Sequence, residues 1–338
     1  MSFKRLDPED FLISADSVTA GAWAGNTPTL TQFFTSSVQV AGTSGDYYIN
    51  VYQTGSTEID AEVQFNISFG NTNGSGSLLY DSGIPGKSPS STIFGQFQNI
   101  ALGDENNSFV FGTTTPANQS FYAITINRAR YKGNIFPGTL ELRLNSASST
   151  RYLTDNSNDT TVVTFNEAGR VYQIVSGTNG SAFSGIGYTS NSGSYGLFLP
   201  DIGTILLNAS ALDLSFANGG IGLNTNYSSN TDGANPSKLY TAISGGANFK
   251  LNSQENVTSD YVFIRARNSE FNYSENPSFI SGSTGEVLYS DFINAPQTFI
   301  TTVGLYNDTN ELLAVAKLSK PLKKDFTKEA LIRVKLDF

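Results

Sequence analysis

Acidic side chains are the groups in this sequence best able to take part in catalysis, because the chain contains no Cys and no His. Without a thiol or an imidazole there is no Cys nucleophile, no Ser-His-Asp arrangement and no Cys or His metal ligand. Paired carboxylates could still hydrolyse a glycosidic bond. Asp104, Glu105 and Glu167 are the candidates, but nothing brings two of them to a working separation, and Glu105 is better explained as the cap of the turn GDENNS. We therefore predict that the protein is not an enzyme and has no cofactor.

The stretch DNSND carries oxygen-bearing side chains at alternate positions from Asp155 to Asp159, as a calcium-binding loop does. Such a loop also needs Gly at its sixth position and a bidentate Glu at its twelfth. Here the sixth position is not Gly, and Glu167 falls one place beyond the twelfth. A polar loop without a metal explains the stretch better.

Short alternating segments must position any such side chains. The chain has 32 Gly, 24 Phe and 16 Tyr but only 14% charged residues, which suits many short strands joined by turns. In AEVQFNISFG, Val63, Phe65, Ile67 and Phe69 alternate with polar residues. Similar segments, among them TIFGQFQNIAL, SFVFG and GTLELRLN, recur roughly every ten residues. We predict a mainly β protein with antiparallel β-sandwich or barrel domains.

These segments divide the chain into four predicted parts. They are an extended amino-terminal arm (1–25), a β-sandwich domain (26–148), a Gly-, Ser- and Asn-rich β domain (149–256) and a carboxyl-terminal β module (257–338). In the third part, Asn208 or Ser210 could cap a short helix that begins at ASALDL. The Gly- and Asn-rich residues after it are predicted to form an exposed loop.

The most regular pattern is a predicted hairpin over residues 298–318, with its turn at 307–310. Its strands carry apolar residues on both faces, which favours a sheet between two layers. The last segment, EALIRVKLDF, is predicted to pair beside the hairpin. Residues 321–324 would then form the connection, and Arg333 and Lys335 would lie on a charged outer face.

The net charge of −9 is unevenly distributed. Residues 317–338 contain seven basic and three acidic side chains, a net charge of +4, so the remainder carries −13. An acidic body argues against nucleic-acid binding. No segment has the roughly twenty apolar residues of a membrane helix, and the first residues lack the apolar core of a secretory signal, so we predict no membrane contact.

The two ends of the chain are the predicted interface. The basic carboxyl end could contact an acidic surface on another subunit, or its lysines could protect an exposed edge strand. Trp23 could anchor an interface, or it could pack in a core. The candidate interface residues are Phe11, Trp23, Lys320, Lys323, Lys324, Arg333 and Lys335.

Four motifs stand out in the last eighty or so residues: FNYSENPSF, PQTFITTVGLYND, ELLAVAKLSKPLKK and EALIRVKLDF. Through them, residues 261–338 resemble the carboxyl-terminal module of virion structural proteins of large contractile-tailed bacteriophages, including those that infect cyanobacteria. The opening FKRLDPEDF fits this family more loosely.

The resemblance implies a non-enzymatic structural component of a phage virion, in the tail, baseplate or neck, assembled in the host cytoplasm. Its partners would be other virion proteins and copies of itself in a symmetric assembly. One alternative is a decoration protein on the head exterior. Another is a host-surface protein that binds carbohydrate through aromatic and Asn-rich loops such as residues 187–196.

Overall fold

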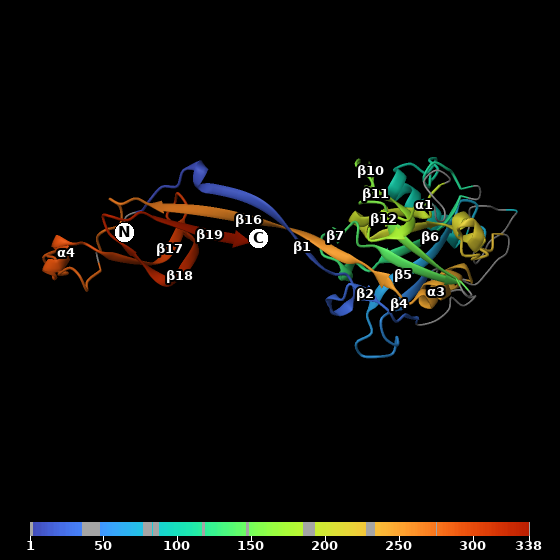
Figure 1. Ribbon diagram of the computed structural model, residues 1–338, viewed down its shortest axis with the longest axis horizontal. Helices are drawn as coiled ribbons and strands as arrows, with labels where there is room; N and C mark the ends of the chain where they lie inside the picture. Colours follow the sequence, from blue (N-terminus) through green and yellow to red (C-terminus); the bar gives the residue numbers. More distant parts are fainter. Residues whose placement is uncertain are drawn as a thin grey trace. The chain divides into compact units, whose positions relative to one another are not determined.

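Figure 1 shows the computed structural model, which describes residues 3–35, 48–76, 83, 88–116, 119–146, 149–184, 193–227, 234–274 and 276–337. The protein is mainly β, as predicted, and its sheets are antiparallel. The chain separates into two compact units. We call residues 18–255 the barrel unit, and residues 1–17 together with 256–338 the terminal unit.

One curled sheet of 13 strands forms the barrel unit. Its order is β2 (Thr29–Leu30), β15 (Phe249–Lys250), β8 (Glu141–Ser146), β9 (Ser149–Asp155), β11 (Gly169–Thr178), β13 (Gly196–Leu199), β14 (Thr204–Asn208), β6 (Ser120–Ile126), β5 (Val63–Asn71), β4 (Tyr48–Tyr52) and β3 (Phe34–Thr35). Two short strands, β10 (Thr164–Asn166) and β12 (Ser181–Ala182), also pair with β11.

The two ends of this strand order come from neighbouring parts of the chain. β2 ends at Leu30 and β3 begins at Phe34. Four Cα–Cα steps span at most roughly 14 Å. The sheet must therefore curl until its outermost strands approach each other, which is the architecture of a barrel or a strongly bent sandwich.

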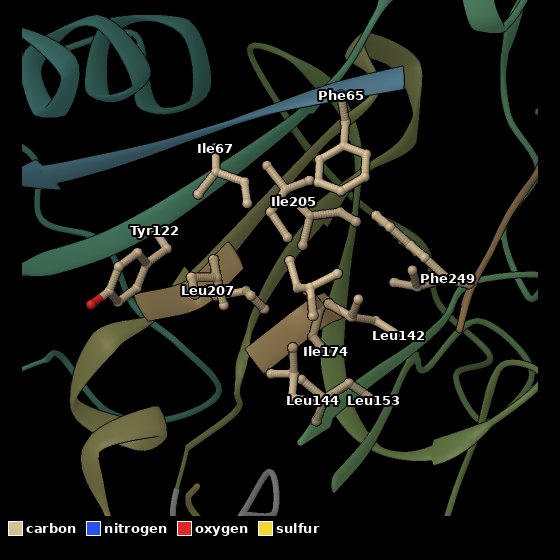
Figure 2. Close-up of a cluster of buried hydrophobic side chains, with 14 of the residues drawn as sticks. Phe65, Ile67, Tyr122, Leu142, Leu144, Leu153, Ile174, Ile205, Leu207 and Phe249 are labelled. Carbon is tan, nitrogen blue, oxygen red and sulfur yellow. The ribbon is translucent and has the colours of Figure 1, made fainter. Parts of the chain in front are cut away.

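Aromatic side chains hold the two ends of the sheet together. The rings of Phe65 on β5 and Phe249 on β15 lie 5.2 Å apart, although these strands are near opposite ends of the strand order. The Trp23 ring contacts both, at 5.9 and 4.8 Å, and its Nε1–H donates to the Phe249 carbonyl at 2.7 Å. Figure 2 shows Phe65 and Phe249 among side chains from several strands that converge on this interior.

Both faces of the central strands are buried. On β6, Tyr122 and Ile124 point into the interior cluster, whereas Phe121 and Ala123 belong to a second cluster on the other face. Strands buried on both sides have nearly continuous apolar sequences. That explains the run LFLPDIGTILL of β13 and β14, which has no clear alternation.

The helices are α1 (Pro89–Leu102), α2 (Ala209–Asp213), α3 (Ala234–Gly246) and α4 (Ser290–Asn294), and single 3-10 turns lie at Pro8–Asp10, Ala24–Asn26, Arg128–Arg130, Pro200–Ile202 and Phe216–Asn218. The short helix predicted after Asn208 is confirmed as α2, with the Asn208 side chain accepting from the Ser210 N–H at 3.1 Å. No helix in the described ranges is both long and apolar enough to span a membrane.

The strand predicted at TIFGQFQNIAL is wrong, because this segment is helix α1. Phe94, Phe97 and Ala101 recur at helical spacing and bury one face in the second cluster. Pro89 starts the helix, and Gly103 ends it in the left-handed conformation, with φ of 67°. Helix α3 likewise begins inside the stretch predicted to be a loop, and it packs Leu239 on the interior cluster.

The structure divides the chain differently from the prediction. Residues 26–148 and 149–256 were expected to form two domains. Instead β8 pairs with β9 through Leu142 and Leu153, and β6 pairs with β14, so strands from both ranges share one sheet and one core. The boundary at 255/256 lies close to the predicted start of the carboxyl-terminal module at 257.

The terminal unit contains a sheet in the order β1 (Phe11–Gly21), β16 (Asn252–Ala266) and β19 (Ala330–Asp337), and a hairpin of β17 (Thr298–Tyr306) and β18 (Leu312–Lys324). β7 (Asn134–Ile135) pairs with residues 253 and 254 of β16, which belong to the barrel unit. The amino-terminal segment is extended, as predicted, and its strand β1 pairs in a sheet. Phe3 packs edge-on against Tyr306, with ring centroids 5.2 Å apart.

The hairpin and its turn are confirmed. Leu305 lies opposite Ala314, and the Asn307 side chain accepts from the backbone N–H of Thr309 at 3.1 Å and of Glu311 at 2.8 Å. Asn310 adopts φ of +61°, a left-handed conformation that Asn tolerates.

The predicted neighbour of the last strand is wrong. β19 pairs with β16, with Val334 opposite Val262, and it does not pair with the hairpin. Residues 321–324 are part of β18, where Lys323 lies opposite Phe299. The alternating apolar residues of β19 fit either neighbour, so the pattern alone could not choose between them.

Replacing Ile205 by Ala tests the interior core. Ile205 is fully buried on β14, so we expect Ile205→Ala to lower the free energy of unfolding by about 2–5 kcal/mol. The matched control is Ile59→Ala, because Ile59 is 98% exposed and should change stability by less than about 0.5 kcal/mol. Denaturant unfolding of both variants is the measurement. Equal effects would contradict the described core.

Candidate interaction surface

The terminal unit buries very few apolar side chains. In the described part of that unit, the buried ones are Val262, Ala266, Ala330 and Val334. They form two cross-strand pairs between β16 and β19. The other buried apolar residues among those described lie in the barrel unit. Since burial of apolar surface is the main force that stabilises a fold, the terminal unit has little to hold it together by itself.

Many large apolar side chains of the terminal unit are instead exposed to solvent, by between 39% and 72% of their surface. They are Phe3, Phe11, Leu12, Ile13, Tyr273, Val287, Leu288, Tyr289, Ile293, Phe299, Tyr306, Leu312, Leu313, Val315, Phe326 and Leu331. Exposed apolar side chains in this number make the terminal unit the candidate interaction surface of the chain.

The hairpin is the most exposed sheet in this unit. Leu313 and Val315 on β18 are 68% and 59% exposed, and Phe299 on β17 is 61% exposed. No third strand pairs with either strand within the described residues. The sequence favoured a sheet between two layers, but in the isolated chain these side chains face solvent.

Arg333 and Lys335 lie on an exposed face of β19, as predicted. Their charged groups are 5.5 and 5.9 Å from the ring of Tyr261 on the neighbouring strand. Lys335 Nζ also lies 2.9 Å from an Asp337 carboxylate oxygen and 3.9 Å from one of Asp16. The hydrogen bond to Asp337 raises the pKa of Lys335 above its ordinary value. Acidic neighbours therefore partly offset this part of the basic end.

The other candidate interface residues divide into exposed and buried ones. Phe11 on β1 is half exposed, and Lys320 and Lys323 on β18 are exposed, so their interface role stays a prediction. Trp23 and Lys324 are instead buried within the chain, so neither side chain is open to a partner in this structure. Trp23 is only 2% exposed and packs in the barrel core, the alternative that its sequence context had left open.

Lys324 is fully buried, and its ammonium group finds hydrogen-bond acceptors inside the chain. Its Nζ donates to the carbonyls of Asn268 and Asp325 at 3.0 and 3.1 Å and to the Asn272 side chain at 2.8 Å. A buried ammonium needs such partners. Lys324 thus connects β18 to the segment that follows β16.

The carboxylates considered for catalysis are only partly brought together. The Glu167 side chain lies beside Gly103, the neighbour of Asp104 in the chain, since a Cβ added at Gly103 would be 2.8 Å from Glu167 Cγ. Asp104, not Glu105, caps the turn there, by accepting from the Asn106 N–H at 2.9 Å. Among the described residues, no three His, Cys, Asp or Glu side chains cluster as a metal site would require.

The DNSND stretch begins at a buried carboxylate. Asp155 is fully buried at the end of β9, and it accepts from the N–H of Gly138 at 2.8 Å and of Ser157 at 3.3 Å. Asp159 accepts from the Ala182 N–H at 2.6 Å. These carboxylates hold a loop in place.

Sequence reasoning missed Leu313 and Val315 as surface residues. Alternating apolar residues in a strand normally indicate a buried face, and nothing local shows that the covering layer is missing. The sequence feature that could have identified them as surface residues is that both faces of the hairpin are apolar. Of the loop suggested for carbohydrate binding, residues 187–192 lie outside the described residues.

Comparisons of the chain with protein-family models, with curated proteins and with solved structures gave no match. The fold and the surface above are therefore the basis for proposing a function, together with the sequence motifs.

Replacing Lys324 by Met tests its structural role. Lys324→Met keeps the length of the side chain but leaves three acceptors without their donor, so we expect a loss of about 2–4 kcal/mol in the terminal unit. Lys320→Met, at an exposed position of the same strand, should change stability by less than about 0.5 kcal/mol. Native-state hydrogen exchange of β17 and β18 is the measurement. Similar exchange in the two variants would show that Lys324 is not structural.

The buried carboxyl group of Asp155 should make the stability of the protein depend on pH. Burial raises its pKa above the ordinary 3.8, against the opposing hydrogen bonds from Ser157 and Gly138. The folded state therefore binds the proton more tightly than the unfolded state, and stability falls as pH rises from about 4 through the raised pKa. We expect Asp155→Asn, which keeps an acceptor oxygen, to remove this fall and to be more stable than wild type at pH 7.

The measurement is the free energy of unfolding between pH 4 and pH 8, by denaturant titration. Wild type, titrated over the same pH range, is the reference for the variant. A variant Asp155→Asn that loses stability at pH 7 would contradict the assignment.

Proposed function

We propose that the protein is a non-enzymatic structural component of a tailed-bacteriophage virion, in the tail, baseplate or neck, and that the terminal unit attaches it to its neighbours. The observation that carries this proposal is the exposed apolar surface of the terminal unit. It lies largely on extended strands, the elements through which a chain can add to the sheet of a partner. The resemblance to virion proteins covers residues 261–338, most of the same unit.

The contrast between the two units supports an assembly role. The barrel unit has an interior cluster and a second cluster under α1, so it has the buried surface of a self-sufficient domain. Among the residues of the terminal unit that the structure describes, four apolar ones are buried and many are exposed. A partner that covers these residues would supply the missing core, as in obligate interfaces that resemble a domain core cut in half.

The first test is whether the protein occurs in purified particles of the phage whose genome encodes it. We expect mass spectrometry to detect it at a fixed number of copies per particle. Its absence from particles purified to constant composition would contradict the proposal.

The second test uses matched substitutions in a phage complemented with variant genes. Phe299→Asp places a charge on the exposed surface of β17 and should reduce incorporation into particles about tenfold or more, because it would bury an unpaired carboxylate. Ile59→Asp, on an exposed residue of the barrel unit, should incorporate normally. Circular dichroism checks that both variants fold. Normal incorporation of Phe299→Asp would show that the terminal unit does not attach the protein to its neighbours through this surface.

A further inference from the structure

The outer edge of β18 has a charge pattern that is complementary to itself. Its apolar segment, Leu312–Ala316, is centred on Ala314. Glu311 lies three residues before that centre and Lys317 three residues after it. The apolar segment is therefore flanked by an acidic residue on one side and, at equal spacing, by a basic residue on the other.

This pattern lies on an edge that the chain leaves open. β17 occupies one side of β18, and no strand pairs with the other side in the part of the chain that the structure describes. An open edge presents a row of backbone donors and acceptors to any strand that can match it. Pro321, which has no N–H, follows Lys320 and sets a natural limit to such pairing.

We propose that two copies of the chain associate by antiparallel pairing of their β18 edges, about a twofold axis at Ala314. In an isologous contact of this kind, residue i of one copy faces residue j of the other, and j faces i. A centre at Ala314 places Glu311 opposite Lys317 of the second copy. This charge match occurs twice, and the result is a four-stranded sheet.

The apolar residues fit the same register. Leu313 lies opposite Val315 of the second copy, and these two side chains are among the most exposed of the hairpin. Leu312 lies opposite Ala316. Cross-strand neighbours on one face of an antiparallel pair contact each other directly, so pairing covers apolar surface as well as the backbone edge.

The matched charges favour a second copy over an unrelated protein as the occupant. Lysines alone would suffice to protect an edge from pairing. An acidic residue at the mirrored position does not add to that protection, but it makes the edge attractive to a copy of itself. This inference deepens the assembly role proposed above, because it names one partner of the terminal unit, yet it can be tested on the purified protein without any particle.

The first experiment is disulfide trapping in the full chain, which contains no Cys of its own. Directly opposed residues of antiparallel strands have Cα atoms roughly 4.5–5.5 Å apart, within the range that a disulfide can bridge. Under mild oxidation we expect Ala314→Cys to give a covalent dimer. Thr301→Cys, an exposed residue on β17, is the control and should stay largely monomeric. Equal cross-linking of the two variants, or none with Ala314→Cys, would overturn the register.

The second experiment exchanges the charges. Glu311→Lys and Lys317→Glu should each weaken the dimer, on the order of tenfold, because each places like charges opposite one another twice. The double variant should recover the affinity of wild type, since it restores both pairs with reversed sign. Glu311 also accepts from Asn307 within its own turn, at 2.8 Å, so the recovery is the diagnostic result.

Sedimentation equilibrium of the four proteins is the measurement. A wild-type chain that stays monomeric at the highest soluble concentration, or a double variant no tighter than the single ones, would overturn the proposed pairing. The virion role would still stand in that case, with another virion protein as the partner of the terminal unit. Absence of the chain from particles would refute the virion role but not a dimer found in solution.

Discussion

The constraint on which this account depends is the shortage of buried apolar surface in the terminal unit. Four buried apolar side chains cannot offset the conformational entropy lost by ordering the strands around them. Local interactions supply part of the difference, such as the three hydrogen bonds of Lys324 and the turn held by Asn307. On the proposal made here, a partner that covers the exposed strands supplies the rest.

The barrel unit shows what a completed core looks like in the same chain. Its sheet curls until β5 and β15 face each other across Phe65 and Phe249, and Trp23 contacts both rings. Its central strands bury both faces, one in the interior and one under α1. The described part of the barrel unit thus buries many more apolar side chains than that of the terminal unit.

Patterns that depend on near neighbours were predictable from the sequence. The alternation in Val63–Phe69, the turn at Asn307 and the cap at Asn208 all act within a few residues, and the structure contains each of them. The pairing of β19 with β16 and the single sheet across residues 148 and 149 depend on contacts distant in sequence, which alternation does not specify. Helix α1 was missed although its Ser-Pro start, helical spacing and final Gly were readable. The burial of Trp23 and Lys324 became clear only from the tertiary structure.

Hydrogen exchange of the backbone amides of β18, measured as a function of protein concentration, tests most directly whether a second copy completes the terminal unit. Amides of residues 312–317 that point away from β17 have no partner strand in the isolated chain. The account predicts that they exchange quickly in dilute protein and become protected as the concentration rises, while amides of the barrel unit do not change. Exchange at these positions that is independent of concentration, in a sample shown to associate, would contradict it.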